Sequence, residues 1–326
     1  MRRNAAKTQQ NQANGSRLGV RVLAQLTLVS VGLVFALASC AEGAPADGDF
    51  EGTHVSPSDD AGTGSPSPPS TGGFNTETSP TEPHEPKEVH VVYGHSATTL
   101  YRLDPETMAI SVVGDFKNCE GILDIALDEA STIYGVSNTT LYTIDKDTAE
   151  CTPKSAPIDD GGRYPTSLSF VPKGTVDPNE EALVGFDDGD YVRIDRHNGS
   201  RTVIGSLGGD LVSSGDIVSV KGGNTYLTVK GKKNSACYEA DCLVQIHPST
   251  GKLLKNWGPI EHKRVFGLGF WAGKVYGFDQ EGNLFAVAFG SNKVVTTTIA
   301  VPNKPVDLSF WGAGSSTSAP LAPTPQ

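Results

Sequence analysis

Short apolar segments recur at regular intervals between residues 89 and 313. The commonest has two apolar residues, any residue, an apolar residue and then Asp or a similar residue. It occurs at Leu100–Asp104, Leu141–Asp145, Tyr191–Asp195, Leu243–His247 and, in a weaker form, Leu284–Ala288. Apolar runs of this length bounded by turn residues are typical of β-strands. We therefore expect five copies of one strand.

Other strand-like segments accompany each copy at fixed places. A second segment lies about nine residues upstream, at Val92–Gly94, Ile133–Gly135, Leu183–Gly185, Thr225–Leu227 and Val275–Gly277. Four units have a third segment further upstream, at Leu123–Leu127, Ser167–Phe170, Gly215–Val218 and Gly267–Phe270. A fourth closes each unit, as at Ser111–Val113 and Arg201–Ile204. Four short strands in a repeat of about 45 residues predict a β-propeller blade, and five such blades fill residues 89–313.

The first unit lacks the third segment, and the end of the repeat region holds an extra copy of it, Val306–Phe310. We expect this copy to complete the first unit. The predicted fold is thus all-β, a five-bladed β-propeller closed by its C-terminal strand. Closure pairs the two ends of the domain and removes sheet edges that would promote aggregation. A β-sandwich is the alternative, although sandwiches do not show five aligned copies.

The segments outside the repeats differ in composition. Residues 1–39 contain five cations, no Asp or Glu, and an apolar run from Val22 to Leu37, an order typical of a secretory signal peptide. Residues 40–88 are rich in Pro, Gly, Ser and Thr, and residues 314–326 have a similar composition. Such segments cannot bury enough apolar surface to offset their ordering entropy. We predict a disordered tether over 40–88 and a disordered tail over 314–326.

The signal segment ends in Leu37-Ala38-Ser39-Cys40, which resembles a bacterial lipobox. The resemblance implies cleavage before Cys40 and a lipid anchor on its sulfur, with acyl chains such as palmitate in the bilayer. Ala41, rather than Asp, favours placement at the outer membrane or cell surface. An ordinary signal peptide that happens to end in Cys is the alternative. Cleavage would change the formal charge from −11 to −16, and so acidic a protein does not fit a nucleic-acid partner.

The motifs of the repeats resemble those of known propellers. Asp124–Leu127, Tyr134–Gly135 and Leu141–Asp145 are similar to repeats of bacterial extracytoplasmic propellers, including NHL-like and quinoprotein-like repeat proteins. The whole chain resembles a lipoprotein family of myxobacteria and their relatives. The resemblance implies a propeller displayed at the cell envelope. It specifies the fold better than the activity, because propellers have many unrelated functions.

Four cysteines remain after Cys40, namely Cys119, Cys151, Cys237 and Cys242. An even number in an exported domain predicts two disulfides, for which three connectivities exist. Blade geometry favours Cys119–Cys151, because one residue precedes the innermost strand of a blade and the other lies at its outermost strand. Cys237–Cys242 would then close an insertion. A metal site is the alternative, but the sequence has no Cys-x-x-Cys pair.

The innermost strands of a propeller line its central channel. Aligning them places Asp124, Ser167, Asp216, Gly267 and Asp307 at one level. Three interpretations stay open. The carboxylates bond backbone amides, or Asp124, Asp216 and Asp307 bind Ca²⁺ through hard oxygens, or their mutual repulsion raises their pKa values for acid–base chemistry. No other cofactor is expected, and the histidines, His95 included, fall in predicted edges and turns.

These features favour a non-enzymatic binding or scaffolding module at the bacterial envelope, with an extracytoplasmic protein or glycan as its ligand. The alternative is a hydrolase or lyase that uses the three carboxylates on an extracellular polymer. Trp271 and Trp311 end equivalent predicted segments, so we expect them near one rim. They would either pack there or form a stacking platform for a sugar ring.

Overall fold

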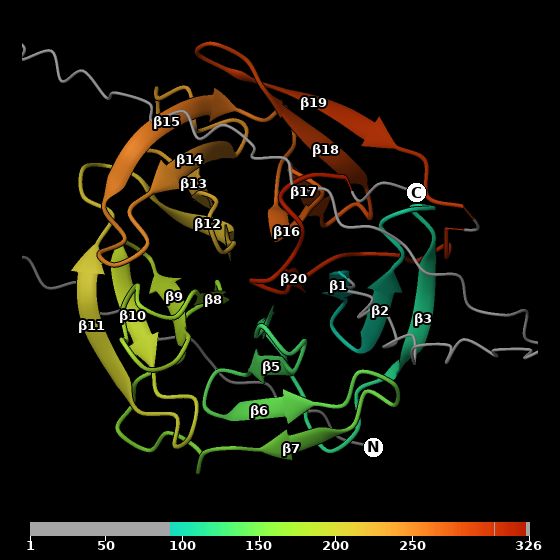
Figure 1. Cartoon of the computed structure of the whole chain (residues 1–326), viewed down its shortest axis with the longest axis vertical. Helices are drawn as coiled ribbons and strands as arrows, with labels where there is room; N and C mark the ends of the chain where they lie inside the picture. Colours follow the sequence, from blue (N-terminus) through green and yellow to red (C-terminus); the bar gives the residue numbers. More distant parts are fainter. Residues whose placement is uncertain (1–91, 303, 324–326) are drawn as a thin grey trace, which may run out of the picture. The chain divides into compact units, whose positions relative to one another are not determined.

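The computed structural model describes residues 92–302 and 304–323. They form twenty strands in five four-stranded antiparallel sheets, arranged as the blades of a ring (Figure 1). The predicted five-bladed β-propeller is therefore confirmed. Within the described ranges, no helix is long and apolar enough to cross a membrane.

The four strands of each blade follow one another from the centre of the ring outward. The first blade is β20 (Gly312–Ser315), β1 (Val92–His95), β2 (Thr99–Leu103) and β3 (Ile110–Asp115). The second is β4 (Asp124–Leu127), β5 (Ile133–Val136), β6 (Leu141–Ile144) and β7 (Cys151–Pro153). The third is β8 (Ser169–Val171), β9 (Ala182–Asp187), β10 (Asp190–Ile194) and β11 (Arg201–Ser206). The fourth is β12 (Val212–Ser219), β13 (Thr225–Lys230), β14 (Cys242–Ile246) and β15 (Leu253–Pro259). The fifth is β16 (Val265–Trp271), β17 (Lys274–Asp279), β18 (Leu284–Phe289) and β19 (Val294–Ile299).

The ring closes between the last strand and the first. β20 pairs antiparallel with β1, with Gly312 opposite His95, and it contacts the inner strands β16 and β4 on either side. Pairing of the two ends was predicted, but the predicted strand is wrong. Residues 306–310 form no strand, and Leu308 packs in the core next to β1 instead. The predicted boundary at residue 313 falls inside β20.

Small residues explain why Gly312–Ser315 takes the closing position. A β-carbon on Gly314 would stand 2.9 Å from the carbonyl oxygen of Ile125 in the next blade. Real β-carbons essentially never come that close, so a larger residue would separate the inner strands. The alternating apolar residues of 306–310 do not form a strand. Two of them, Leu308 and Phe310, are buried in the core instead.

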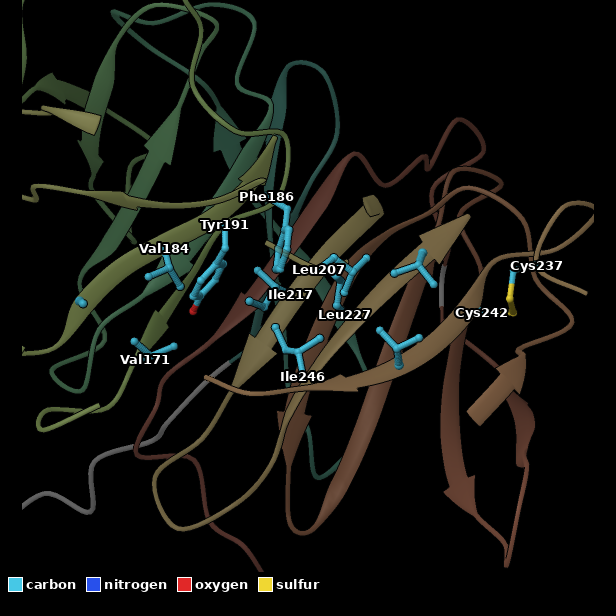
Figure 2. Close-up of a cluster of buried hydrophobic side chains, with 13 residues drawn as sticks. Val171, Val184, Phe186, Tyr191, Leu207, Ile217, Leu227, Cys237, Cys242 and Ile246 are labelled. Atoms are coloured by element: carbon cyan, nitrogen blue, oxygen red, sulfur yellow. A yellow bond between two sulfur atoms is a disulfide. The ribbon is translucent and has the colours of Figure 1, made fainter. Parts of the chain in front are cut away.

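Apolar clusters between adjacent blades hold the ring together. Figure 2 shows the cluster between the third and fourth blades, where Phe186 and Tyr191 face Ile217 and Leu227. The Tyr191 hydroxyl donates a hydrogen bond to the Pro248 carbonyl at 2.7 Å, so its polar end is satisfied while the ring is buried. Because each cluster draws on two blades, the core is continuous around the ring.

Both predicted disulfides are confirmed. Cys119, in the connection between the first two blades, is bonded to Cys151, the first residue of β7. Cys237 is bonded to Cys242, which begins β14. The first bond joins residues 32 positions apart and the second residues 5 apart. Only the first therefore constrains a long stretch of the unfolded chain.

Candidate functional site at the mouth of the central channel

Most of the residues that the sequence analysis aligned lie at the same height along the inner strands. Asp124, Gly267 and Gly312 lie directly opposite Val136, Phe278 and His95 of the second strands, which places all three at the same height. Ser167 and Asp216 occupy the equivalent positions in the third and fourth blades. Four of the five aligned residues are therefore correct.

Asp307 is the exception. It lies in an exposed turn before the closing strand, and Gly312 takes its place at the channel. The error follows directly from the misplaced closing strand, which shifted the alignment by five residues.

Asp124 and Asp216 each fasten one inner strand to the next blade. The Asp124 carboxylate accepts the N–H of Ile125 at 2.9 Å and that of Leu168, in the third blade, at 2.7 Å. The Asp216 carboxylate accepts the N–H of Ile217 and that of Leu268, in the fifth blade, both at 2.6 Å. Both side chains are completely buried. The two bonds per carboxyl group satisfy backbone donors that no neighbouring strand reaches.

The same two carboxyl groups also meet each other. They lie within hydrogen-bonding reach across the channel, although their strands are two blades apart. Burial raises the pKa of both carboxyl groups well above the usual range, and the proximity of Asp216 raises that of Asp124 further. Two carboxylates cannot bond each other without a proton. Burial and mutual proximity therefore both favour a proton on this pair of carboxyl groups.

His95 completes this buried polar level. Its Nδ1 lies 2.8 Å from the Ser96 carbonyl oxygen, which fits a proton on Nδ1, and its Nε2 is buried without a hydrogen-bond partner in the described structure. Burial lowers the pKa of His95 to about 4. A β-carbon on Gly312 would overlap both Nε2 and Asp124 Oδ1, so only glycine fits between them. The expectation that His95 lies in an edge or turn is wrong.

This arrangement matches the first of the three interpretations, because the carboxyl oxygens bond backbone amides. Asp307, the third carboxylate of the predicted Ca²⁺ site, lies in an exposed turn before β20 and not at this level of the inner strands. Within residues 92–302 and 304–323, no three His, Cys, Asp or Glu side chains gather in a metal-binding arrangement.

Directly above this level lies a pocket of about 340 Å³. Leu123, Thr166, Gly215, Phe266 and Trp311 line it, and each directly precedes one residue of the polar level. Ser213, Ser214 and Gln280 complete the lining. Sequence patterns alone did not predict this pocket. The pocket could have been found from the residue that directly precedes each aligned position. That set is complete only when Gly312, rather than Asp307, is aligned with Asp124.

The C-terminal segment crosses the other end of the channel. Ser316 donates a hydrogen bond to the Asp128 carbonyl in the second blade, and the Thr317 hydroxyl bonds the Glu181 carboxylate in the third. Lys221 N, in the fourth blade, donates to the Thr317 carbonyl, and Gly273 N, in the fifth, to that of Pro320. The segment thereby ties four blades together and covers the end opposite the pocket.

The two tryptophans expected near one rim lie at opposite ends of the inner strands. Trp271 ends β16, whereas Trp311 directly precedes β20. The shift of the closing strand is again the reason. Trp311 alone lines the pocket, and 40% of its surface is exposed.

No protein-family profile matches the sequence, and no curated protein matches it. Among solved structures, the chain is similar to one from a nidogen–laminin complex, with a TM-score of 0.42 and 14% identity over 70% of this chain and 99% of that chain. It is also similar to a gluconolactonase from Xanthomonas campestris, with a TM-score of 0.40 and 13% identity over 65% and 72% of the two chains. A Bacteroides caccae protein of unknown function gives 0.34 and 14% over 68% and 77%. None of these similarities identifies a function for this chain. Its own architecture places it in the class of five-bladed β-propellers.

Proposed function

We propose that this protein is a bacterial lipoprotein of the myxobacterial type, whose propeller binds an extracytoplasmic protein or glycan at the mouth of its channel. The Leu37–Cys40 motif after a basic, apolar leader supports a lipid anchor on Cys40 at the outer membrane or cell surface. These residues lie outside the described part of the chain. A tether over 40–88 would hold the acidic propeller away from anionic headgroups.

The observation that carries the binding role is the pocket above the buried carboxyl pair. Its lining combines apolar and aromatic side chains with a few hydroxyl and amide groups, as is usual for small-ligand sites. Its volume of about 340 Å³ lies at the lower end of the usual range for such sites. Loops and strand ends on a rigid ring hold the lining in place, so little ordering entropy opposes binding.

The alternative of a hydrolase or lyase has less support. Asp124 and Asp216 have no exposed surface and their oxygens accept hydrogen bonds from backbone amides, whereas Asp307 lies in an exposed turn. A substrate in the pocket would not reach the carboxyl pair, and acid–base catalysis requires that contact.

Lipidation is tested by mass spectrometry of the protein purified from a bacterial host, and by partitioning into detergent. We expect an N-terminus at Cys40 that carries acyl chains. A Cys40→Ser variant should lose the chains and move to the aqueous phase, whereas Ser39→Ala should keep both properties. Retention of residues 1–39, or an unmodified Cys40, would contradict the anchor.

Binding at the mouth is tested by crosslinking on intact cells, using the full-length protein and a Thr166→Trp variant. Thr166 is exposed at the pocket, so a tryptophan there should fill it without disturbing the core. We expect the variant to lose the crosslinked partner or glycan while keeping its melting temperature. Equal crosslinking of both proteins would contradict a binding role for the pocket. A matched substitution at an exposed residue away from the pocket, Val203→Trp, serves as control.

A further inference from the structure

The pocket at the channel mouth has a chemical character that restricts its ligand. None of the described side chains that line it is ionisable. Two ion pairs lie near the lining along the chain. Arg163, three residues before Thr166, lies 2.5 Å from Asp187, and Glu281, next to Gln280, lies 3.4 Å from Arg264. Three further carboxyl groups directly adjacent in sequence to lining residues, those of Asp124, Asp216 and Asp279, are buried and hydrogen-bonded. An ionic ligand would therefore lose its hydration without meeting a charged side chain in the lining, which disfavours it.

Trp311 provides an aromatic surface on one side of the pocket. Its backbone N–H donates to the His95 carbonyl at 2.7 Å, and the next residue, Gly312, is already paired in β20. The sheet therefore sets the position of the Trp311 backbone at the mouth of the channel. An exposed aromatic side chain there suits a ligand with a flat apolar side, such as the C–H face of a pyranose ring. Phe266 and Leu123 add apolar surface.

Hydroxyl and amide groups line the same pocket. Ser213 Oγ is buried and has no hydrogen-bond partner in the described structure. Ser214 Oγ is buried without a hydrogen-bond partner as well, so neither serine hydroxyl is accessible from the open part of the pocket. The side chains of Thr166 and Gln280 are exposed and partly exposed, respectively, and they offer donors and acceptors to a ligand rich in hydroxyl groups.

From this combination we infer that the channel mouth binds a neutral saccharide, with one ring stacked on Trp311 and its hydroxyls bonded to Thr166 and Gln280. This inference rests on the proposed binding function and specifies its ligand class. The site would bind the sugar non-covalently, without making or breaking a covalent bond.

The test is titration of the full-length protein in detergent with glucose, galactose, mannose, N-acetylglucosamine and their disaccharides, followed by calorimetry and tryptophan fluorescence. Glucuronate and glucosamine are the matched controls, because they keep the ring but carry a charge. We expect saturable binding of at least one neutral sugar and about tenfold weaker binding of its charged counterparts.

Variants locate the site. Trp311→Ala should weaken binding about tenfold, and Trp311→Phe should restore part of it, because stacking contributes on the order of that factor. Gln280→Ala should weaken binding less, and Val306→Ala, at a fully solvated position, should not change it. Melting temperatures of all variants are measured in parallel, so that loss of folding is recognised.

Two results would overturn the inference. One is the absence of saturable binding for every neutral sugar. The other is binding that Trp311→Ala leaves unchanged. If sugars fail but Thr166→Trp still abolishes crosslinking to a protein partner, the saccharide inference is wrong and the binding function remains. If Thr166→Trp abolishes nothing, the proposed binding function itself is wrong.

Discussion

Asp124 and Asp216 stand on inner strands that are separated by a whole blade, yet their carboxyl groups meet in the middle of the ring. Each also accepts a backbone N–H from the following blade. The second blade is thus bonded to the third, and the fourth to the fifth, and the contact between the two carboxyl groups joins these two pairs of blades. The centre of this propeller is a polar junction that holds blades together, and the pocket lies directly above it.

The proton shared by the pair predicts a pH dependence of stability. Folding raises both pKa values above the unfolded value near 3.9, so the contribution of the pair is complete below that pH and is lost as the pH rises through the folded values. Asp216→Asn should lower stability by about 1–3 kcal/mol at acidic pH, because its amide nitrogen cannot accept the lost N–H bond. The variant cannot ionise at this position, so its deficit relative to the wild type should shrink as the pH rises. Chemical denaturation at a series of pH values measures this difference, with the exposed Asp159→Asn as control; a constant difference would contradict the shared proton.

His95 gives the stability of the fold a pH dependence of the opposite sign. Folding lowers its pKa from 6.5 to about 4, so the neutral ring leaves stability intact above pH 6.5, and stability falls as the pH drops toward 4. The full loss corresponds to about 3 kcal/mol. The equivalent positions in the third and fifth blades are Phe186 and Phe278, so His95→Phe should be tolerated and should remove this acid sensitivity. The comparison is a denaturation series between pH 7 and pH 4, and an unchanged slope in the variant would show that His95 is not the group responsible.

Glycine at position 312 is required by two neighbours, Asp124 and His95. A methyl group there would overlap Asp124 Oδ1 and His95 Nε2, so Gly312→Ala should destabilise the protein by about 3 kcal/mol through overpacking. Gly189 is the matched control, because nothing lies within 4 Å of an added β-carbon there. Gly189→Ala should leave the melting temperature nearly unchanged. Similar melting temperatures for the two variants would mean that the inner strands can move apart at little cost.

The two disulfides should differ in their contribution to stability. Cys119–Cys151 closes a span of 32 residues and should stabilise the fold by about 4 kcal/mol, whereas Cys237–Cys242 closes 5 and should contribute about 2 kcal/mol. Replacing each pair with alanine, followed by urea denaturation, measures both values. A larger loss for the short loop would indicate that native packing near Cys237, rather than loop entropy, sets the effect.

The C-terminal segment should contribute to stability although it follows the last strand. Glu181 is buried, and burial raises the pKa of its carboxyl group, while bonds from the Thr317 hydroxyl and the Glu129 N–H partly offset that rise. Thr317→Val keeps the shape but removes one donor, so we expect a loss of about 1–3 kcal/mol. Thr148→Val, at an exposed outer turn, is the control. Equal stability of both variants would mean that the segment only rests on the blades.

The sequence by itself determined the strand repeat, the number of blades, the joining of the two ends and both disulfides. These features follow from local patterns, since apolar alternation and turn residues such as Asp145 act over a few residues, and Asp145 Oδ1 indeed accepts the N–H of Asp147 at 2.9 Å and of Thr148 at 2.8 Å. The tertiary structure alone decided which segment closes the ring, and with it the positions of Asp307, Trp311 and the pocket. Gly312–Ser315 has almost no apolar pattern, and it is selected because only small residues fit between Asp124, His95 and Ile125. That fit depends on atoms brought together from three parts of the chain, so no local sequence pattern could reveal it.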